Sequence, residues 1–163
     1  MGIYPTGKTV DAAELSPDFR RHPIDDHGKL RYAYGKVTSP AGGIAANSTL
    51  GLCWLPTGRK RLVLPLSYIA WGIFGAGRTL DVGHAAYMKR PPNETVEADD
   101  PDALIDGLDV AAAGQRQFGV TAAAVPMKFD MYSTDEVLIY ATVLGGTMPA
   151  GITVEVLLAY LYE

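Results

Sequence analysis

Short apolar segments separated by glycine and proline turns are the feature that most constrains the fold of this chain. Its 163 residues include 18 glycines and 11 prolines, and these fall between the apolar runs. Turn signals at spacings of roughly 8–12 residues are typical of β-sandwiches and barrels, whereas units of alternating strand and helix have longer periodic segments. The sequence therefore predicts an all-β fold.

Alternation of apolar and polar residues marks the strands. The clearest case is Ile152 to Tyr162, in which every second residue is apolar or aromatic. The segment from Leu62 to Trp71 is apolar on both faces, which indicates one long strand covered on both sides, with Leu62, Leu64, Leu66, Tyr68 and Ala70 on one face. Within it Pro65 marks an edge or a bulge, because proline cannot donate to a ladder. Further strands are expected at Leu30 to Gly35, Thr49 to Leu55, Arg78 to Gly83, Met127 to Tyr132 and Glu136 to Leu144.

One segment has the composition of a helix start. Asp100-Pro101-Asp102 offers a capping aspartate, a proline at the first helical position and an acid in the first turn. Gly107 and Gly114 limit the helix to a short one. Together, these segments predict a sandwich or barrel of about seven or eight strands with one short helix.

Residues 1–28 differ from the rest of the chain. They combine charged groups with turn signals and show no clean periodicity. We therefore predict an extended N-terminal arm over residues 1–28 and a β-sandwich domain over residues 29–163. The length fits a single folded domain with a core of its own.

Charge and hydropathy exclude several classes of function. A net charge of −4 implies no phosphate-seeking field, so we expect no nucleic-acid partner. Met1 to Asp11 has no apolar core of the kind found in signal peptides, and the longest apolar stretch, Leu62 to Phe74, is too short to span a bilayer. We expect a protein that is made in a cytoplasm, stays soluble there and has no membrane partner.

The single cysteine, Cys53, lies in an apolar run and is expected to be a small buried residue.

No catalytic, cofactor-binding or metal-binding residue is predicted. The cluster of His22, Asp25, Asp26 and His27 matches no helix-borne zinc motif, and its segment lacks the periodicity that would fix a site. An acidic run comprises Glu94, Glu97, Asp99, Asp100, Asp102, Asp106 and Asp109. This run does not fit the register of a calcium loop, and we interpret it as a solvated loop and helix face. Cation binding by the run stays open.

Other motifs have ordinary structural explanations. The glycines Gly72, Gly75 and Gly77 lack the ending of a phosphate-binding loop and are interpreted as a turn. Arg59-Lys60-Arg61 is expected to be a solvated strand end, or else to meet an acidic patch on a neighbour. His84 has no motif around it, and no serine or cysteine lies in a nucleophile elbow. The sequence makes no positive case for an enzyme or a cofactor.

Several segments taken together resemble a group of small virion proteins of tailed bacteriophages. The similarity covers about Leu50 to the C-terminus, with a weaker match before it at Tyr4-Pro5-Thr6-Gly7. Its segments are Leu55-Pro56-Thr57-Gly58, Phe74 to Gly83, Asp102 to Gly114, Asp135 to Val143 and the Gly145-Gly146 hairpin with the final strand. The loop from Pro91 to Asp100 and the arm are more elaborate than in a minimal member of the group.

The resemblance implies a jelly-roll-like β-sandwich that acts as a capsid decoration or cement protein. Proteins of this group bind the outer surface of an icosahedral head and bridge major capsid subunits, often as dimers or trimers, and they have no catalytic residues. The expected partners are thus the major capsid protein and further copies of the chain. Another virion part (neck, tail or head fibre) and a carbohydrate-binding or receptor-binding sandwich remain alternatives. Sugar binding would favour an exposed aromatic platform, whereas Trp54 and Trp71 are expected to be buried in apolar strands.

Because the arm lacks a core pattern of its own, we expect the arm and one sheet edge to make the contacts between subunits. Deletion of residues 1–28 should therefore weaken binding to capsids while the sandwich domain still folds. Co-sedimentation of the truncated protein with capsids measures this. Unchanged assembly and capsid binding would contradict the expectation.

Overall fold

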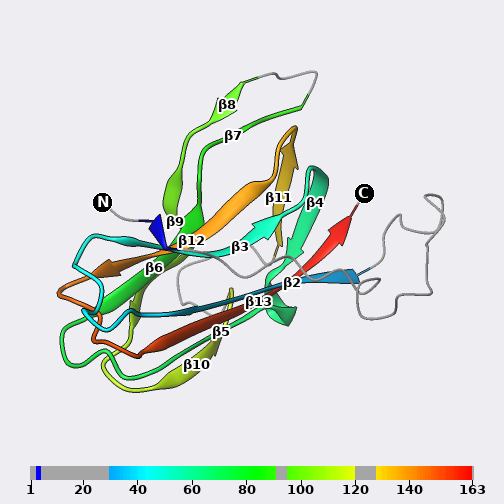
Figure 1. The fold of residues 1–163 in the computed structure, drawn as a ribbon. Helices are drawn as coiled ribbons and strands as arrows, with labels where there is room; N and C mark the ends of the chain where they lie inside the picture. The colour runs from blue at the N-terminus through cyan, green and yellow to red at the C-terminus, as the bar shows by residue number, and fades with distance from the viewer. Residues whose placement is uncertain (1–2, 5–29, 91–94, 120–127, 163) are drawn as a thin grey trace, which may run out of the picture.

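The computed structural model describes residues 3–4, 30–90, 95–119 and 128–162, and it shows two β-sheets packed face to face (Figure 1). One sheet, here the acidic sheet, has its strands in the spatial order β1 (Ile3–Tyr4), β3 (Thr49–Leu55), β12 (Val137–Leu144), β6 (Thr79–His84) and β9 (Asp100–Asp109). Strand β1 pairs in parallel with β3, and the other pairings in this sheet are antiparallel.

The second sheet, here the tyrosine sheet, is built around β13 (Thr153–Tyr162). Strand β2 (Leu30–Thr38) pairs along one edge of β13. On the other edge β5 (Tyr68–Trp71) and β4 (Gly58–Val63) pair with successive parts of β13. Beyond them lie β10 (Gly114–Gln117), next to β5, and β11 (Lys128–Ser133), next to β4.

The order of these strands is that of a jelly roll. If β4 with β5 and β10 with β11 are each taken as one interrupted strand, and β1 is set aside, each sheet has four main strands. We count these eight main strands along the chain, with β2 as strand 1 and β13 as strand 8. The tyrosine sheet then has the spatial order 1, 8, 3, 6, and the acidic sheet has the order 2, 7, 4, 5. This arrangement confirms the expected jelly-roll-like sandwich of about seven or eight strands.

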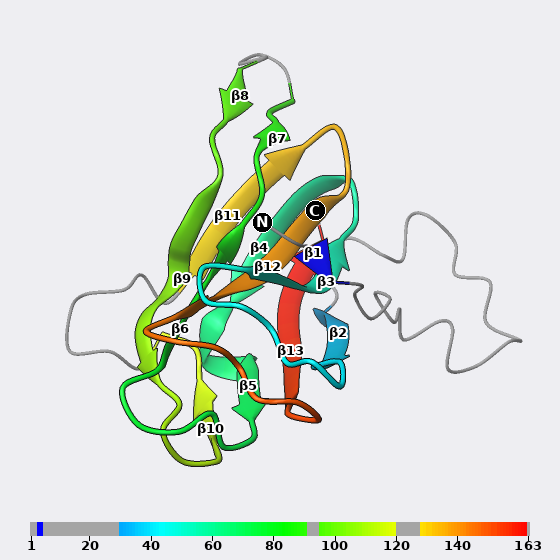
Figure 2. The same cartoon turned by 60° about the vertical axis from the view of Figure 1, so that its left-hand side comes forward.

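A short hairpin projects from the body of the sandwich. It consists of β7 (Tyr87–Met88) and β8 (Val96–Glu97), which continue β6 and β9 past the end of the sheets, as Figure 2 shows. The base of the hairpin is held to the neighbouring β11–β12 turn, because Thr134 donates a backbone hydrogen bond of 3.0 Å to the carbonyl of Met88.

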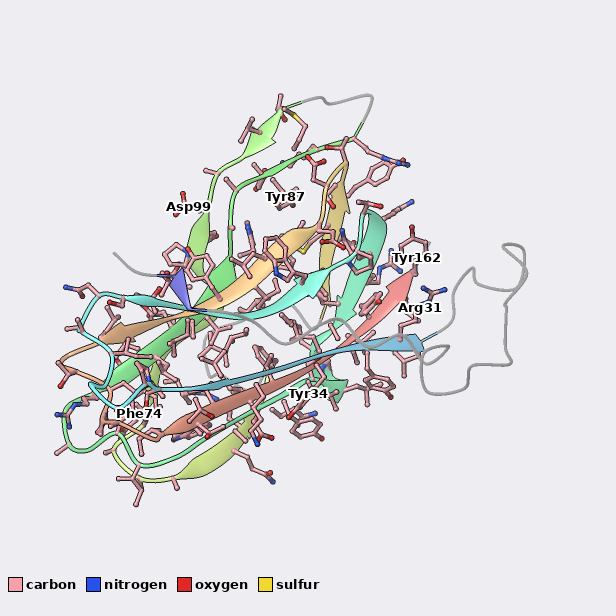
Figure 3. All side chains as sticks on the ribbon, in the orientation of Figure 1. Arg31, Tyr34, Phe74, Tyr87, Asp99 and Tyr162 are labelled. Carbon is pink, nitrogen blue, oxygen red and sulfur yellow. The ribbon has the colours of Figure 1, made fainter. Side chains whose placement is uncertain are left out.

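The core lies between the sheets and follows from the alternation seen in the sequence. The inward residues of β13 are buried, as expected: Val154, Val156, Leu158 and Tyr160. Leu50, Leu52 and Leu55 of β3 and Ile139, Ala141 and Val143 of β12 complete the layer from the other sheet. Phe74, labelled in Figure 3, and Phe118 are also fully buried members of this core. A sheet of alternating residues becomes stable only when its apolar face meets such a partner.

The prediction of a short helix after Asp100 is wrong, because this segment forms the edge strand β9. Pro101 suits either structure, since on an edge strand it removes no ladder hydrogen bond that the sheet needs. The register between β6 and β9 is irregular on both sides of Val82, where Val82 pairs with Ile105. At this irregularity Leu104 and Ile105 are consecutive in the sequence and both buried. Two adjacent apolar residues break the alternation of a strand and are also found on the buried face of a helix.

The single long strand expected from Leu62 to Trp71 is also wrong. A one-turn 3-10 helix, η2 (Leu64–Leu66), divides it at Pro65 into β4 and β5. The interruption changes the phase of the alternation, so Leu62 and Leu64 are buried while Tyr68 is exposed. The other strands expected from the sequence are confirmed within one to three residues at their ends. Of residues 1–28 only Ile3 and Tyr4 are described, so the division into arm and domain stays a prediction.

The two sheets approach most closely where β2 faces β3. Gly35 is buried there, and a Cβ atom at this position would lie 1.7 Å from the backbone oxygen of Leu52. No side-chain rotation relieves a clash with a backbone atom, so only glycine fits without moving a strand.

Gly35→Ala should therefore lower the free energy of unfolding by about 3 kcal/mol or more, because β2 must separate from β3. Gly42→Ala is the matched control, since a Cβ there meets nothing within 4 Å, and it should change stability by less than about 0.5 kcal/mol. Urea denaturation curves of the three proteins measure both effects. Equal midpoints for the Gly35 and Gly42 variants would contradict the prediction.

Candidate interaction surface

The outer face of the tyrosine sheet carries a cluster of exposed aromatic and apolar side chains. Tyr34 in β2 and Tyr68 in β5 lie directly opposite Leu157 in β13, on either side of it. Their exposed fractions are 37% for Tyr34, 43% for Tyr68 and 36% for Leu157. Tyr32 lies two residues before Tyr34 and so shares its face. We call these four residues the tyrosine face; Figure 3 shows Tyr34 on the side of its sheet that is turned away from the acidic sheet.

Ion pairs border the tyrosine face. Lys36 and Glu155 occupy the neighbouring row of the β2–β13 ladder, and their Nζ and Oε1 atoms are 2.7 Å apart. The hydrogen bond from Lys36 to Glu155 raises the pKa of the lysine. On the other side Arg61 of β4 donates to Asp130 of β11 over 2.7 Å. These cross-strand pairs leave no net charge at the border.

Most of the acidic run lies on the other sheet, along the edge strand β9, whereas Glu97 lies in β8 and Asp99 between the two strands. Asp102, Asp106 and Asp109 are exposed there. A hydrogen bond with Asp102 raises the pKa of Asp100, and partial burial, with Asp106 and Asp102 nearby, raises the pKa of Asp81. The run was interpreted as a solvated loop and helix face, and the location of Asp100, Asp102, Asp106 and Asp109 on a strand corrects the helical part of that interpretation. Across the described residues, no group of three or more His, Cys, Asp or Glu side chains is arranged to hold a metal ion.

His84, the histidine in the described part of the chain, lies in a packing environment. His84 is buried between the sheets, where its ring contacts Tyr87 edge-on at 5.4 Å and Phe129 at 5.6 Å between centroids. Its Nδ1 lies 3.1 Å from the carbonyl oxygen of Ala85. Burial raises the pKa of Tyr87, the nearer aromatic neighbour, to about 12. His84 thus serves as a packing residue. The cluster of His22, Asp25, Asp26 and His27, together with Glu94, lies outside the described residues.

The basic cluster departs from expectation at its central residue. Arg59 is exposed, but Lys60 points inward and is fully buried, so the expected solvated strand end is corrected at this position. The Nζ atom of Lys60 donates to the hydroxyl of Ser133 over 2.6 Å and to the carbonyl of Pro56. Ser133 in turn donates to the carbonyl of Asp135. Burial lowers the pKa of Lys60 to about 8, with Arg90 lowering it further and Glu136 opposing the shift.

Cys53 and the glycines behave as predicted. Cys53 is buried in β3, and burial raises the pKa of its thiol to about 12, so the thiol is an inert core group. Gly75 and Gly77 have positive φ values of 101° and 71°, which confirms that they form a turn.

The tryptophans differ from the expectation that both are buried. Trp71 is partly buried and its indole donates to the carbonyl of Ala112, but Trp54 is 38% exposed on the outer face of β3. Its cross-strand neighbour on β12 is the apolar Leu138 rather than a polar residue, so Trp54 does not by itself form the platform with polar neighbours that sugar binding would favour.

Sequence reasoning found only part of the tyrosine face. The strand expected from Leu30 to Gly35 carries Tyr32 and Tyr34 on one face, whereas Tyr160 and Tyr162 of the expected final strand pack in or against the core. The guanidinium of Arg31 also lies over the ring of Tyr162, 5.1 Å from the ring centroid. Tyr68 and Leu157 were missed, because their exposure depends on the break at η2 and on the register of β13. The side chain of Tyr4 is not described.

Comparison with known proteins identifies the fold. No protein-family model matches the sequence, and no curated protein matches it. Among solved structures, a chain in the capsid of Ralstonia phage GP4 is similar over 96% of this chain and 97% of its own length, with 17% identity and a TM-score of 0.59. A chain in the capsid asymmetric unit of cyanophage Pam1 is similar over 94% and 98%, with 15% identity and a TM-score of 0.55.

These similarities confirm, at the level of the fold, the resemblance to phage virion proteins that the sequence predicted. Both matches extend over nearly the whole of both chains, so each matched chain is close to this one in length. Within the described part of the chain, no helix is long and apolar enough to cross a membrane.

The buried Lys60 predicts a particular pH dependence of stability. Its pKa is about 8 in the folded protein and 10.5 in an unfolded chain, so between these values the unfolded state binds more protons and the free energy of unfolding rises with pH. The rise should be on the order of 3 kcal/mol. Lys60→Met should remove it, whereas Lys36→Met, which alters an exposed ion pair, should retain it.

Denaturation midpoints measured from pH 7 to pH 10.5 for both variants and the unchanged protein check this prediction. Parallel curves for the Lys60 variant and the unchanged protein would show that Lys60 keeps an ordinary pKa.

Proposed function

We propose that this chain is a non-enzymatic structural protein of a bacteriophage virion. It acts as a decoration or cement protein that binds the outer surface of an icosahedral head and stabilises contacts between major capsid subunits. The observation that carries the proposal is the jelly-roll fold shared over nearly the full length with chains in two phage capsid structures.

The chemistry of the described surface supports a binding role. Its two distinctive features are the tyrosine face and the acidic edge along β9, and both suit contacts between proteins. The buried His84 and Cys53 have no nucleophile–base geometry around them. We therefore assign the chain no catalytic residue, cofactor or metal.

Binding only to the assembled lattice would provide the stabilisation. A protein that binds the mature capsid, and not its separated subunits, shifts the equilibrium toward the assembled state by RT ln(1 + [L]/Kd), about 2.7 kcal/mol per site at a hundredfold excess over Kd. Repetition over many identical sites multiplies this modest contribution. A head under pressure from packaged DNA would benefit from such contacts.

The proposed partners are the major capsid protein and other copies of this chain, as a dimer or trimer. The proposed location is the capsid surface, after synthesis in the host cytoplasm. The net charge of −4 makes the packaged nucleic acid an unfavourable partner. A place in the neck, tail or head fibre would need the same fold with a different binding site.

The proposal predicts saturable binding to heads. Purified protein mixed with emptied heads that lack it should bind in a fixed number per capsid subunit, and occupied heads should resist heating better than bare ones. Quantitative co-sedimentation and light scattering during a temperature ramp measure the two effects. Absence of binding at high protein concentration would overturn the decoration role and would direct attention to tail components and to glycan screening.

A further inference from the structure

The tyrosine face concentrates exposed apolar surface in one place. Tyr34, Leu157 and Tyr68 form a continuous row across three adjacent strands, and Tyr32 extends it along β2. Next to β5, Leu66 in η2 is 44% exposed. Single exposed apolar residues are ordinary on a protein surface, whereas a contiguous group of aromatic residues on a flat sheet marks a contact site. Tyrosine is also among the residues enriched at protein interfaces.

Two pairs of charged groups at the border of this face are bonded within the chain. Lys36 is bonded to Glu155 and Arg61 to Asp130, each over 2.7 Å. Covering the face would thus not leave these four charged groups without a partner, which is the main penalty when charged groups are buried. A partner for this face needs no compensating charge, and it should itself be apolar and neutral.

A second copy of the chain meets this requirement. The same face of another molecule carries the same apolar residues and the same two neutral ion pairs at its border, and a two-fold axis brings identical patches together. The chain carries a net charge of −4, and the aspartates of β9 lie in the other sheet layer. Packing of tyrosine face on tyrosine face keeps the acidic strands of the two copies on the outside, where their mutual repulsion is smallest.

We infer that the outer face of the tyrosine sheet is a dimer interface, in which Tyr32, Tyr34, Tyr68 and Leu157 of one copy pack against the same residues of a second copy. The contact is sheet on sheet, as between the layers of a β-sandwich. The inference specifies the homo-oligomer of the proposed function and rests on that part of it. It leaves the arm and the sheet edges available for the capsid.

Light scattering and sedimentation of the protein alone, without capsids, test the inference. The protein should have twice the 17.4 kDa mass of one chain. The double variant Tyr34→Lys with Leu157→Lys should weaken dimerisation by about 100-fold or more and yield monomers, because charges replace two facing apolar groups. The second variant, Tyr34→Thr with Leu157→Thr, places residues with a high strand propensity at both positions and should weaken the dimer in the same direction.

The matched control is Met88→Lys with Val96→Lys. These residues also form an exposed cross-strand pair, on the projecting β7–β8 hairpin, with exposed fractions of 39% and 63%. The control adds the same two charges and should leave the dimer intact. Circular dichroism and urea midpoints establish that each variant is folded.

A monomeric unchanged protein, a trimer, or a dimer that persists in both Tyr34/Leu157 variants would overturn the inference. Capsid binding is measured separately with the same proteins. A dimer that dissociates as expected but ignores capsids would retain this interface and refute the decoration role. Monomers that bind capsids through the tyrosine face would refute the dimer interface and support the decoration role.

Discussion

The pairing of β13 along both of its edges is the interaction on which the rest of the structure depends. β2 occupies one edge over nine residue pairs, and β5 and β4 share the other edge. The inward side chains of β13 lie in the centre of the core, and its outward side chains hold the centre of the tyrosine face. One strand therefore fixes the register of the sheet, the packing between the layers and the composition of the candidate interface.

The two outer surfaces of the sandwich differ in character because of this arrangement. The tyrosine sheet exposes aromatic residues bordered by internal ion pairs, whereas the acidic sheet ends in a strand rich in exposed aspartates. Surfaces of such unequal chemistry suit a protein with two kinds of contact, one between copies and one with a different partner. His84 lies between the sheets and Lys60 points inward, so both are buried and belong to neither surface.

The sequence was sufficient for the strands and for the fold class because alternation along a strand is a local property. Ile152 to Tyr162 illustrates this, since its inward residues could be named before the structure was known. The helix expected at Asp100 failed because its cap signature is also local, while pairing with β6 is not. The tyrosine face could be predicted only in part, since Tyr68 becomes an outward residue through the turn at Pro65 and meets Leu157 through a register set about ninety residues away. The burial of Lys60 depended in the same way on Ser133 in a distant strand.

The position of β13 in the chain also has a consequence for synthesis. It is the last of the described strands, yet it lies between β2, which precedes all the main strands, and β4 with β5. A ribosome must therefore deliver the segment from Thr153 onward before the tyrosine sheet can form at all, and long-range pairings of this kind fold slowly. A nascent chain that stops short of this segment has no central strand and presents no tyrosine face. Only chains translated through β13 can then form the tyrosine sheet, so the topology itself excludes chains that are truncated before this strand.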